Sequence, residues 1–132
     1  MTSGDVYDSF VRQGGLATDS AYPDSPEKGS QCLFTYAMDG IQMLGNHGYE
    51  RIEAMNEEQI KRAVVQIGPV SAMFQVMPDF LSYRDGIYQG SSSCVPSMET
   101  ISHALLIIGF GTDPTSSQDF WIVQNSWGTT WG

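Results

Sequence analysis

The sequence has 132 residues, 41% of them hydrophobic, which is enough for one domain with its own core and too few for two domains of ordinary size. Its formal net charge of −9 argues against nucleic acid and an anionic membrane as partners, because both are polyanions. No apolar run approaches the roughly 20 residues that cross a bilayer, and the first residues lack the basic and apolar regions of a signal peptide.

In chain order, the first predicted element is a helix over residues 5–13, which Gly14-Gly15 should end. Residues 16–48 are rich in turn signals and are predicted to be mostly loop. Within them, the segment 36–44 fits a helix or an irregular strand equally well. A short strand is predicted over residues 48–54.

The clearest predicted helix begins after Asn56. Asn56 is a suitable N-cap and Gln59 occupies the third helical position, as in a capping box. Gly68-Pro69 ends the helix. Its predicted apolar stripe consists of Ile60, Ala63, Val64 and Ile67.

The remaining elements are predicted strands. Residues 70–76 predict a strand and residues 78–81 a turn. The nearly continuous apolar run 103–110 is typical of a strand buried on both faces. A hairpin loop over 111–118 then leads to a returning strand over 120–123. We therefore expect an α+β fold, with an antiparallel barrel-like sheet and one or two peripheral helices.

Two side chains at the open end of this hairpin could carry chemistry. His103 begins the apolar strand and Asn125 follows the strand predicted to pair with it. The asparagine oxygen can accept a hydrogen bond from one imidazole nitrogen, which leaves the other nitrogen as a base. Trp127 could shield that bond from water. A structural histidine at a strand end fits the same residues, so both interpretations stay open at this point.

The stretch SHALLIIGFG, followed by FWIVQNSWGTTWG, resembles the papain-like cysteine proteases, including the cathepsin L-like enzymes. The stretches GGLATDSAYP, EEQIKRAVVQIGPVSAMF and FLSYRDGIYQG resemble further segments of that family in order and spacing. The resemblance covers nearly the whole chain. It implies the β-rich right half of the papain fold, with 1–132 as one domain and 1–22 as a remnant of the helical half.

The resemblance also implies roles for individual residues. His103 would be the general base that pairs with a cysteine thiolate, Asn125 would orient it, and Trp127 would cover their contact. Ser102 departs from the family pattern, which has Asn or Asp before the histidine, and this weakens a backbone contact to the substrate. The implied substrate-binding positions are Met73, Ile101, Ser102 and Ala104.

The family's nucleophile lies in a Cys-Gly-Ser-Cys-Trp motif that this sequence does not contain. We therefore expect the chain to supply the His/Asn half of a cysteine endopeptidase site and to be inactive alone. Its expected partners are a peptide or protein substrate, or a complementing chain that carries the cysteine. An uncovered apolar face also predicts self-association. The alternative is a non-catalytic binding or regulatory module. The resemblance implies a lysosomal, vacuolar or secreted location.

The two cysteines, Cys32 and Cys94, have partners outside this chain if the resemblance holds, and both are then expected as free thiols or as linked to another polypeptide. A second interpretation makes Cys32, in GSQCLF, the nucleophile. Three features oppose it: Cys32 follows the Gly-Gly-Leu segment, lies only 71 residues (103 − 32) before His103, and precedes a helix that Gly40 weakens. With two Cys and two His in no paired spacing, we expect no metal and no cofactor.

Overall fold

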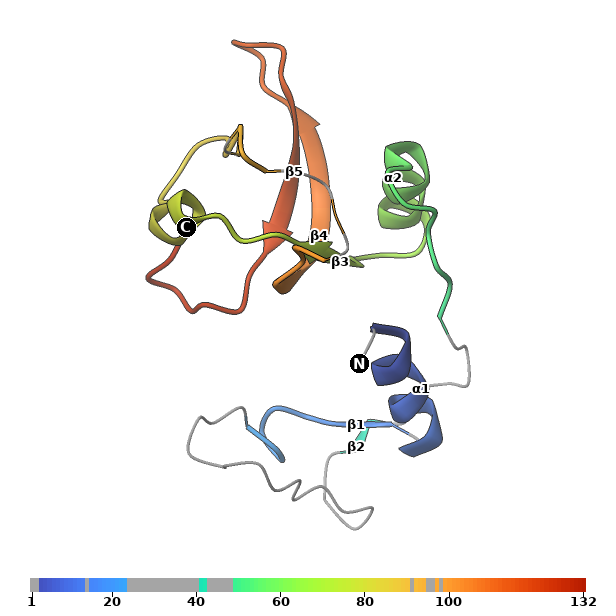
Figure 1. The fold of residues 1–132 in the computed structure, drawn as a ribbon. Helices are drawn as coiled ribbons and strands as arrows, with labels where there is room; N and C mark the ends of the chain where they lie inside the picture. The colour runs from blue at the N-terminus through green and yellow to red at the C-terminus, as the bar shows by residue number, and fades with distance from the viewer. Residues whose placement is uncertain are drawn as a thin grey trace. The chain divides into compact units, whose positions relative to one another are not determined.

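The computed structural model describes residues 3–13, 15–23, 41–42, 49–90, 92–94, 97 and 99–132. They belong to two compact units, Met1–Arg51 and Ile52–Gly132 (Figure 1). Cys32 lies outside the described residues, as does all of the ambiguous segment 36–44 except Ile41 and Gln42. The assignment of residues 1–22 to a helical half stays a prediction.

The first unit contains one helix and a small strand pair. The helix α1 spans Ser3–Gln13 and so begins before the predicted start at Asp5, while its end is as predicted. Just beyond that end, the backbone N–H of Gly15 donates to the Phe10 carbonyl at 3.2 Å. Strand β1, Leu16–Ala17, pairs antiparallel with β2, Ile41–Gln42. The strand predicted over 48–54 is absent from the described residues 49–54. A strand exists only within a ladder, and no described strand pairs with these residues.

The second unit begins with the predicted capped helix. Helix α2 spans Glu57–Gln66, and Asn56 Oδ1 accepts the backbone N–H of Gln59 at 3.1 Å. The Gln59 side chain does not complete a reciprocal box, because its oxygen accepts the backbone N–H of Glu53 at 3.2 Å. Ile67 was expected in the apolar stripe but is 82% exposed, since it lies beyond the last helical residue.

Three antiparallel strands form the sheet of this unit, in the order β3-β4-β5 (Figure 1). Their bounds are Val70–Phe74, His103–Thr112 and Asp119–Gln124. The turn predicted over 78–81 is a short 3₁₀ helix, η2, over Pro78–Ser82. The predicted α+β class, with an antiparallel sheet and helices, is therefore confirmed.

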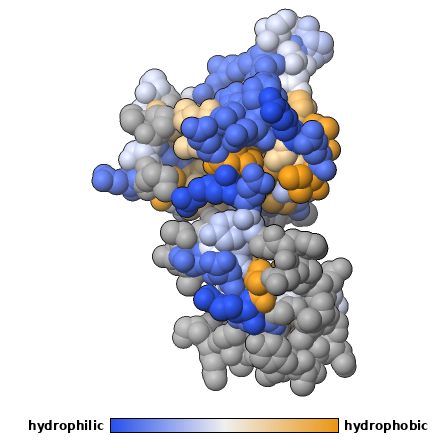
Figure 2. All heavy atoms as spheres, turned by 90° about the vertical axis from the view of Figure 1, so that its right-hand side faces the viewer, coloured by the Kyte–Doolittle hydropathy of each residue, from blue (hydrophilic) through white to orange (hydrophobic). Residues whose placement is uncertain are grey.

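The two faces of β4 differ in exposure, so the prediction of a strand buried on both faces is wrong. Ile107 is 6% exposed and Leu105 is also buried, whereas Ile108 is 43% exposed. Helix α2 packs against β3 and β4, and one helix can cover only one face of a sheet. Figure 2 faces the side of this unit that carries α2, and hydrophobic residues reach the surface there too, among hydrophilic ones.

The β4–β5 hairpin has an irregular register, and a glycine of β4 makes room for a ring of β5. Its register shifts between Ile107 and Gly109, as at a β-bulge. A Cβ atom placed on Gly111 would lie 2.8 Å from Cζ of Phe120, its partner on β5. Glycine at this position therefore leaves room for the Phe120 ring to lie across β4.

Candidate active site

The open end of the β4–β5 hairpin brings His103 and Asn125 together. His103 is the first residue of β4, and Asn125 directly follows the last residue of β5. His103 Nε2 lies 2.9 Å from Asn125 Oδ1. Both side chains are half-buried. The contact requires only that the hairpin close in its observed register, which is why residues 22 positions apart meet here.

A backbone group fixes the direction of this hydrogen bond. The backbone N–H of Ser126 lies 2.8 Å from the same Asn125 oxygen. Because a backbone N–H can only donate, the atom that it contacts must be the amide oxygen rather than the amide nitrogen. His103 Nε2 must then be the protonated nitrogen in its contact with that oxygen. In the neutral imidazole, Nδ1 is left with a free lone pair and can accept a proton.

The other end of the Asn125 amide has no such partner. Among the described residues, Nδ2 is buried without a hydrogen-bond acceptor. A flip of the amide would place this nitrogen against the Ser126 N–H, which is also a donor, and would lose that bond. The bond from Ser126 to the oxygen therefore keeps the amide in one orientation, despite the cost of about 1–3 kcal/mol for an unpaired buried group.

Trp127 covers this pair from one side. Its ring lies 5.0 Å from the His103 ring, centroid to centroid, at an interplanar angle of 33°. An aromatic ring at this distance excludes water from the face of the imidazole and so protects the hydrogen bond to Asn125. The covering role that the resemblance implies for Trp127 stays a prediction.

Phe80 and Trp131 complete the surroundings of Trp127, and the sequence analysis did not single them out. Phe80 is 4% exposed, and its ring lies 5.7 Å from that of Trp127 and 4.9 Å from that of Trp131. The Phe80 ring also packs on that of Phe74 in β3, with the two ring centroids 4.7 Å apart. A signal existed, since Phe80 is the first residue of FLSYRDGIYQG and Trp131 the last but one of NSWGTTWG, but nothing local shows that the two segments meet.

The four predicted substrate-binding residues lie at the adjoining ends of β3 and β4. Met73 of β3 is 48% exposed and sits directly opposite Ala104 of β4. Ile101 is half-buried just before β4. Ser102 has an additional structural task, because its hydroxyl oxygen accepts the backbone N–H of Val76 at 3.1 Å.

Of the two cysteines, the structure describes Cys94. Its thiol is free and exposed, with Sγ 3.6 Å from Gln75 Oε1. In the described part of the chain, no three His, Cys, Asp or Glu side chains gather as a metal site would require. The helices of that part are also too short or too polar to cross a membrane.

The chain is similar to known proteins in sequence and in fold. The sequence model described as "Papain family cysteine protease" matches residues 2–132. The chain is 37% identical over 123 residues to a cathepsin L-like proteinase of Fasciola hepatica, and 37% identical over 127 residues to a pro-cathepsin H of Medicago truncatula. These matches cover 93% and 96% of this chain but 35% and 34% of the relatives. The chain thus spans about a third of their length.

A solved structure is similar over nearly the whole of this chain. The digestive procathepsin L2 proteinase from the larval midgut of Tenebrio molitor superposes with a TM-score of 0.81 at 30% sequence identity. The similarity covers 98% of this chain and 38% of that one.

Proposed function

Because this chain belongs to the papain family of cysteine proteases, we propose that it supplies the His/Asn half of a thiol-dependent endopeptidase site. The observation that carries the proposal is the 2.9 Å contact between His103 Nε2 and Asn125 Oδ1, with its direction set by Ser126. This contact leaves His103 Nδ1 as the atom that exchanges a proton with the nucleophile and the leaving group.

In the proposed reaction, Nδ1 of His103 takes the proton of a cysteine thiol, and the thiolate attacks the carbonyl carbon of a peptide bond. The imidazolium then returns the proton to the leaving amine as the carbon–nitrogen bond breaks. Water, deprotonated by the same nitrogen, hydrolyses the resulting thioester and releases the cysteine. Asn125 keeps the imidazole in one orientation throughout these steps, and Trp127 keeps water away from their contact.

The nucleophile of this reaction has to come from a segment outside the 132 residues, since the sequence has no Cys-Gly-Ser-Cys-Trp motif. We propose that the chain alone is inactive and that a complementing segment provides the thiol. The substrate is a peptide or protein. The cathepsin names of several relatives support a lysosomal, vacuolar or secreted location.

The test is hydrolysis of a fluorogenic dipeptide amide under reducing conditions. The chain alone should give no hydrolysis. Activity should follow addition of a polypeptide with the Cys-Gly-Ser-Cys-Trp segment of a relative, and His103→Ala in this chain should abolish it. Hydrolysis by the chain alone that disappears in a Cys32→Ser variant would overturn the proposal and make Cys32 the nucleophile.

A non-catalytic binding module is the second candidate, and the missing nucleophile motif favours it. It predicts that the chain binds peptides although no complementing segment restores hydrolysis. Fluorescence anisotropy with labelled peptides separates the two candidates. Binding without restored activity supports the module.

For the isolated chain we also propose association with a second copy. Exposed apolar side chains on the sheet, such as Met73, Ile108 and Ile122, support it, because large uncovered apolar surfaces drive association. Size-exclusion chromatography with light scattering should show a mass above that of one chain. A monomer that persists across dilution would reject this part of the proposal.

A further inference from the structure

The segment that carries Asn125 and Trp127 is not held by secondary structure. Residues 125–132 are all described and form neither helix nor strand. Directly after Trp127, Gly128 turns the backbone at φ 80°, a conformation that favours glycine. Since no ladder fixes Trp127 over His103, other contacts must hold this segment in place.

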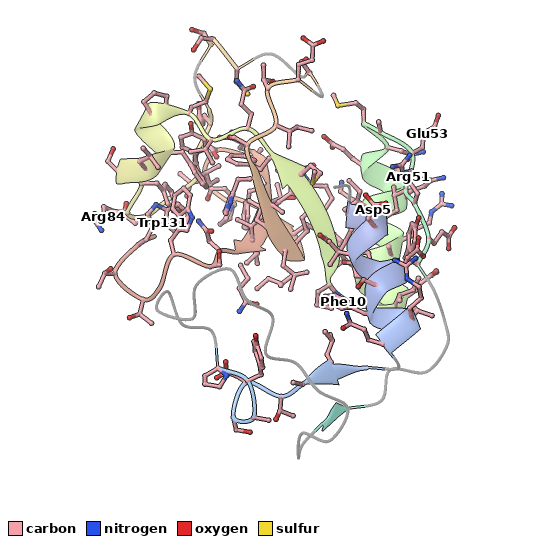
Figure 3. The ribbon with its side chains drawn as sticks, turned by 60° about the horizontal axis from the view of Figure 1, so that its bottom comes forward. Asp5, Phe10, Arg51, Glu53, Arg84 and Trp131 are labelled. Carbon is pink, nitrogen blue, oxygen red and sulfur yellow. The ribbon has the colours of Figure 1, made fainter. Side chains whose placement is uncertain are left out.

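Two hydrogen bonds connect the segment to residues 80–84. The indole N–H of Trp131 donates to the Phe80 carbonyl at 3.1 Å. The guanidinium of Arg84 donates through Nη1 to the Thr130 carbonyl. Arg84 and Trp131 lie at the same edge of the molecule in Figure 3. The two bonds join positions 51 and 46 residues apart, so they tie the end of the described chain to η2 and the residue that follows Tyr83.

The other end of this connection lies in the packed interior of the unit. Phe80 is buried, and its ring packs on Phe74, which pairs directly with His103 in the sheet. The rings of Trp127 and Trp131 pack edge to face at 5.0 Å. The position of Trp131 therefore affects that of Trp127 through their ring contact, and the ring of Trp127 in turn packs on the imidazole of His103.

We propose that Arg84 and Trp131 form a clasp, consisting of these two hydrogen bonds, that holds Trp127 over the His103–Asn125 pair. Arg84 is a positioning residue in this arrangement. It touches neither His103 nor Asn125 and acts through Thr130, Trp131 and Trp127. The inference rests on the proposed function, because the position of Trp127 matters to catalysis only if His103 is the base.

Arg84 suits this task because it brings a charged donor to a carbonyl at the surface. A charged donor forms a stronger hydrogen bond than a neutral one. Its side chain is exposed, so its loss leaves the buried rings in place and releases only the Thr130 carbonyl. The segment then opens more often, and water reaches the His103 Nε2 proton during each opening.

The test measures exchange of the His103 Nε2 proton with water, by NMR on the whole 132-residue chain with ¹⁵N-labelled histidine. A His47→Gln variant assigns the signal, since the chain has two histidines. Arg84→Ala should speed exchange about five- to tenfold, as expected for the loss of one such hydrogen bond. Trp131→Phe, which keeps a ring but loses the N–H donor, should have an effect of the same size. Arg84→Lys keeps a charged donor and should restore most of the protection.

Arg62→Ala is the matched control, because it removes the same side chain from the exposed surface of α2. The proposal would be overturned if the His103 Nε2 proton exchanged at the same rate in Arg84→Ala as in Arg62→Ala. It would also be overturned if this proton exchanged as fast in Arg84→Lys as in Arg84→Ala. These measurements need no nucleophile. A failed complementation assay with the expected exchange rates would therefore reject the endopeptidase function and leave the clasp intact.

Discussion

The backbone N–H of Ser126 lies 2.8 Å from Asn125 Oδ1, and the same oxygen lies 2.9 Å from His103 Nε2. One main-chain donor thus fixes which end of the amide faces the imidazole, and with it which imidazole nitrogen stays free. The proposed chemistry needs this assignment, because only a free Nδ1 can take a proton from a thiol.

We predict that neutral His103 carries its proton on Nε2 and that this proton gives a resolved, slowly exchanging NMR signal. Asn125→Ala should abolish the slow exchange, because it removes the acceptor. Ser126→Ala is the control: it keeps the backbone N–H and should leave the signal unchanged. Nitrogen chemical shifts that show a protonated Nδ1 in the neutral ring would contradict the assignment.

The hairpin loop should lose stability in acid because of Asp113. The Ser116 hydroxyl and the backbone N–H groups of Thr115 and Ser116 donate to this carboxylate and lower its pKa. A lowered folded-state pKa stabilises the fold above the ordinary carboxyl range, and this contribution is lost as the pH falls through the lowered value. Asp113→Ala should therefore lower Tm at neutral pH, and its effect should shrink as the pH falls below the ordinary carboxyl range.

Thermal unfolding followed by circular dichroism across this pH range makes the comparison. Asp85→Ala, at another exposed aspartate, serves as the control and should change Tm little at any pH. An Asp113→Ala effect that is the same in acid and at neutral pH would show that the charge of the carboxylate is not the cause.

Tyr88 should make the fold sensitive to alkali. Burial, together with the 2.9 Å hydrogen bond that its phenol donates to Asp79, raises the pKa of Tyr88 to about 12. A raised folded-state pKa means that its contribution is complete below about pH 10 and is lost between about pH 10 and pH 12. The ultraviolet difference titration between the native chain and Tyr88→Phe isolates this group. Asp79→Asn removes a negative charge and should lower the pKa of Tyr88, whereas titration of Tyr88 near pH 10 in the native chain would contradict the prediction.

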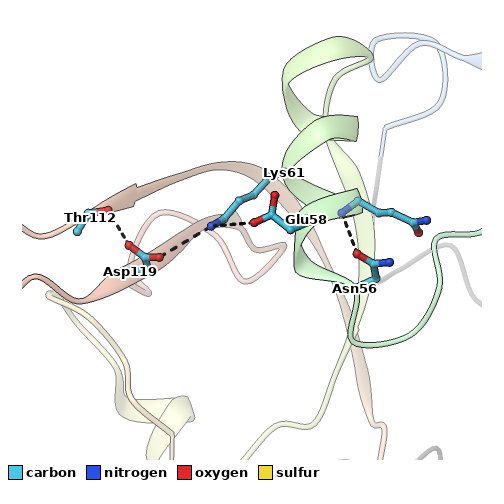
Figure 4. Close-up of polar contacts among 6 residues, drawn as sticks. Asn56, Glu58, Lys61, Thr112 and Asp119 are labelled. Atoms are coloured by element: carbon cyan, nitrogen blue, oxygen red, sulfur yellow. Dashed lines mark hydrogen bonds and ion pairs between the residues drawn. The ribbon is translucent and has the colours of Figure 1, made fainter.

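Lys61 links α2 to the hairpin, and its contribution should depend on salt. Its Nζ lies 3.9 Å from Glu58 Oε1 and 3.8 Å from Asp119 Oδ2 (Figure 4). Thr112 holds the Asp119 carboxylate from the other side at 2.6 Å. Because exposed ion pairs contribute only up to about 1 kcal/mol each, Lys61→Met should lower the free energy of unfolding by about 0.5–1.5 kcal/mol. Chemical denaturation in about 1 M salt should show most of this difference gone, because salt screens the ion pairs. A difference of the same size in high salt would show that packing, and not charge, is its cause.

The sequence predicted the elements whose causes are local. The Asn56 cap, the Gly68-Pro69 stop and the alternation of apolar strands with turns act within a few residues, and the structure has the corresponding helix and strands. The meeting of His103 with Asn125 also follows from one local fact, that a hairpin returns beside its start.

The sequence could not predict what depends on distant partners. Whether β4 is buried on one face or two depends on which layers cover it, and the apolar run of β4 is the same in both cases. The strand expected at 48–54 is absent from the described residues 49–54 for the same reason. Its sequence pattern is local, whereas a strand forms only by pairing with a partner elsewhere in the chain. The contact of Phe80 with Trp131 joins segments 51 residues apart, and no periodicity in either segment indicates it.

The two ends of the β4–β5 hairpin are expected to form at different stages of folding. A hairpin closes from its turn, which here lies at Asp113–Gln118, and the His103–Asn125 pair lies at the far end. We therefore expect this pair to be the last part of the hairpin to form its contacts and the first to lose them. Ser102 holds that end from the other side. Its N–H donates to the Phe74 carbonyl of β3, and its hydroxyl oxygen accepts the N–H of Val76, just beyond β3. We therefore expect a chain that has folded only in part to lack the His103–Asn125 contact, which needs all three strands in register.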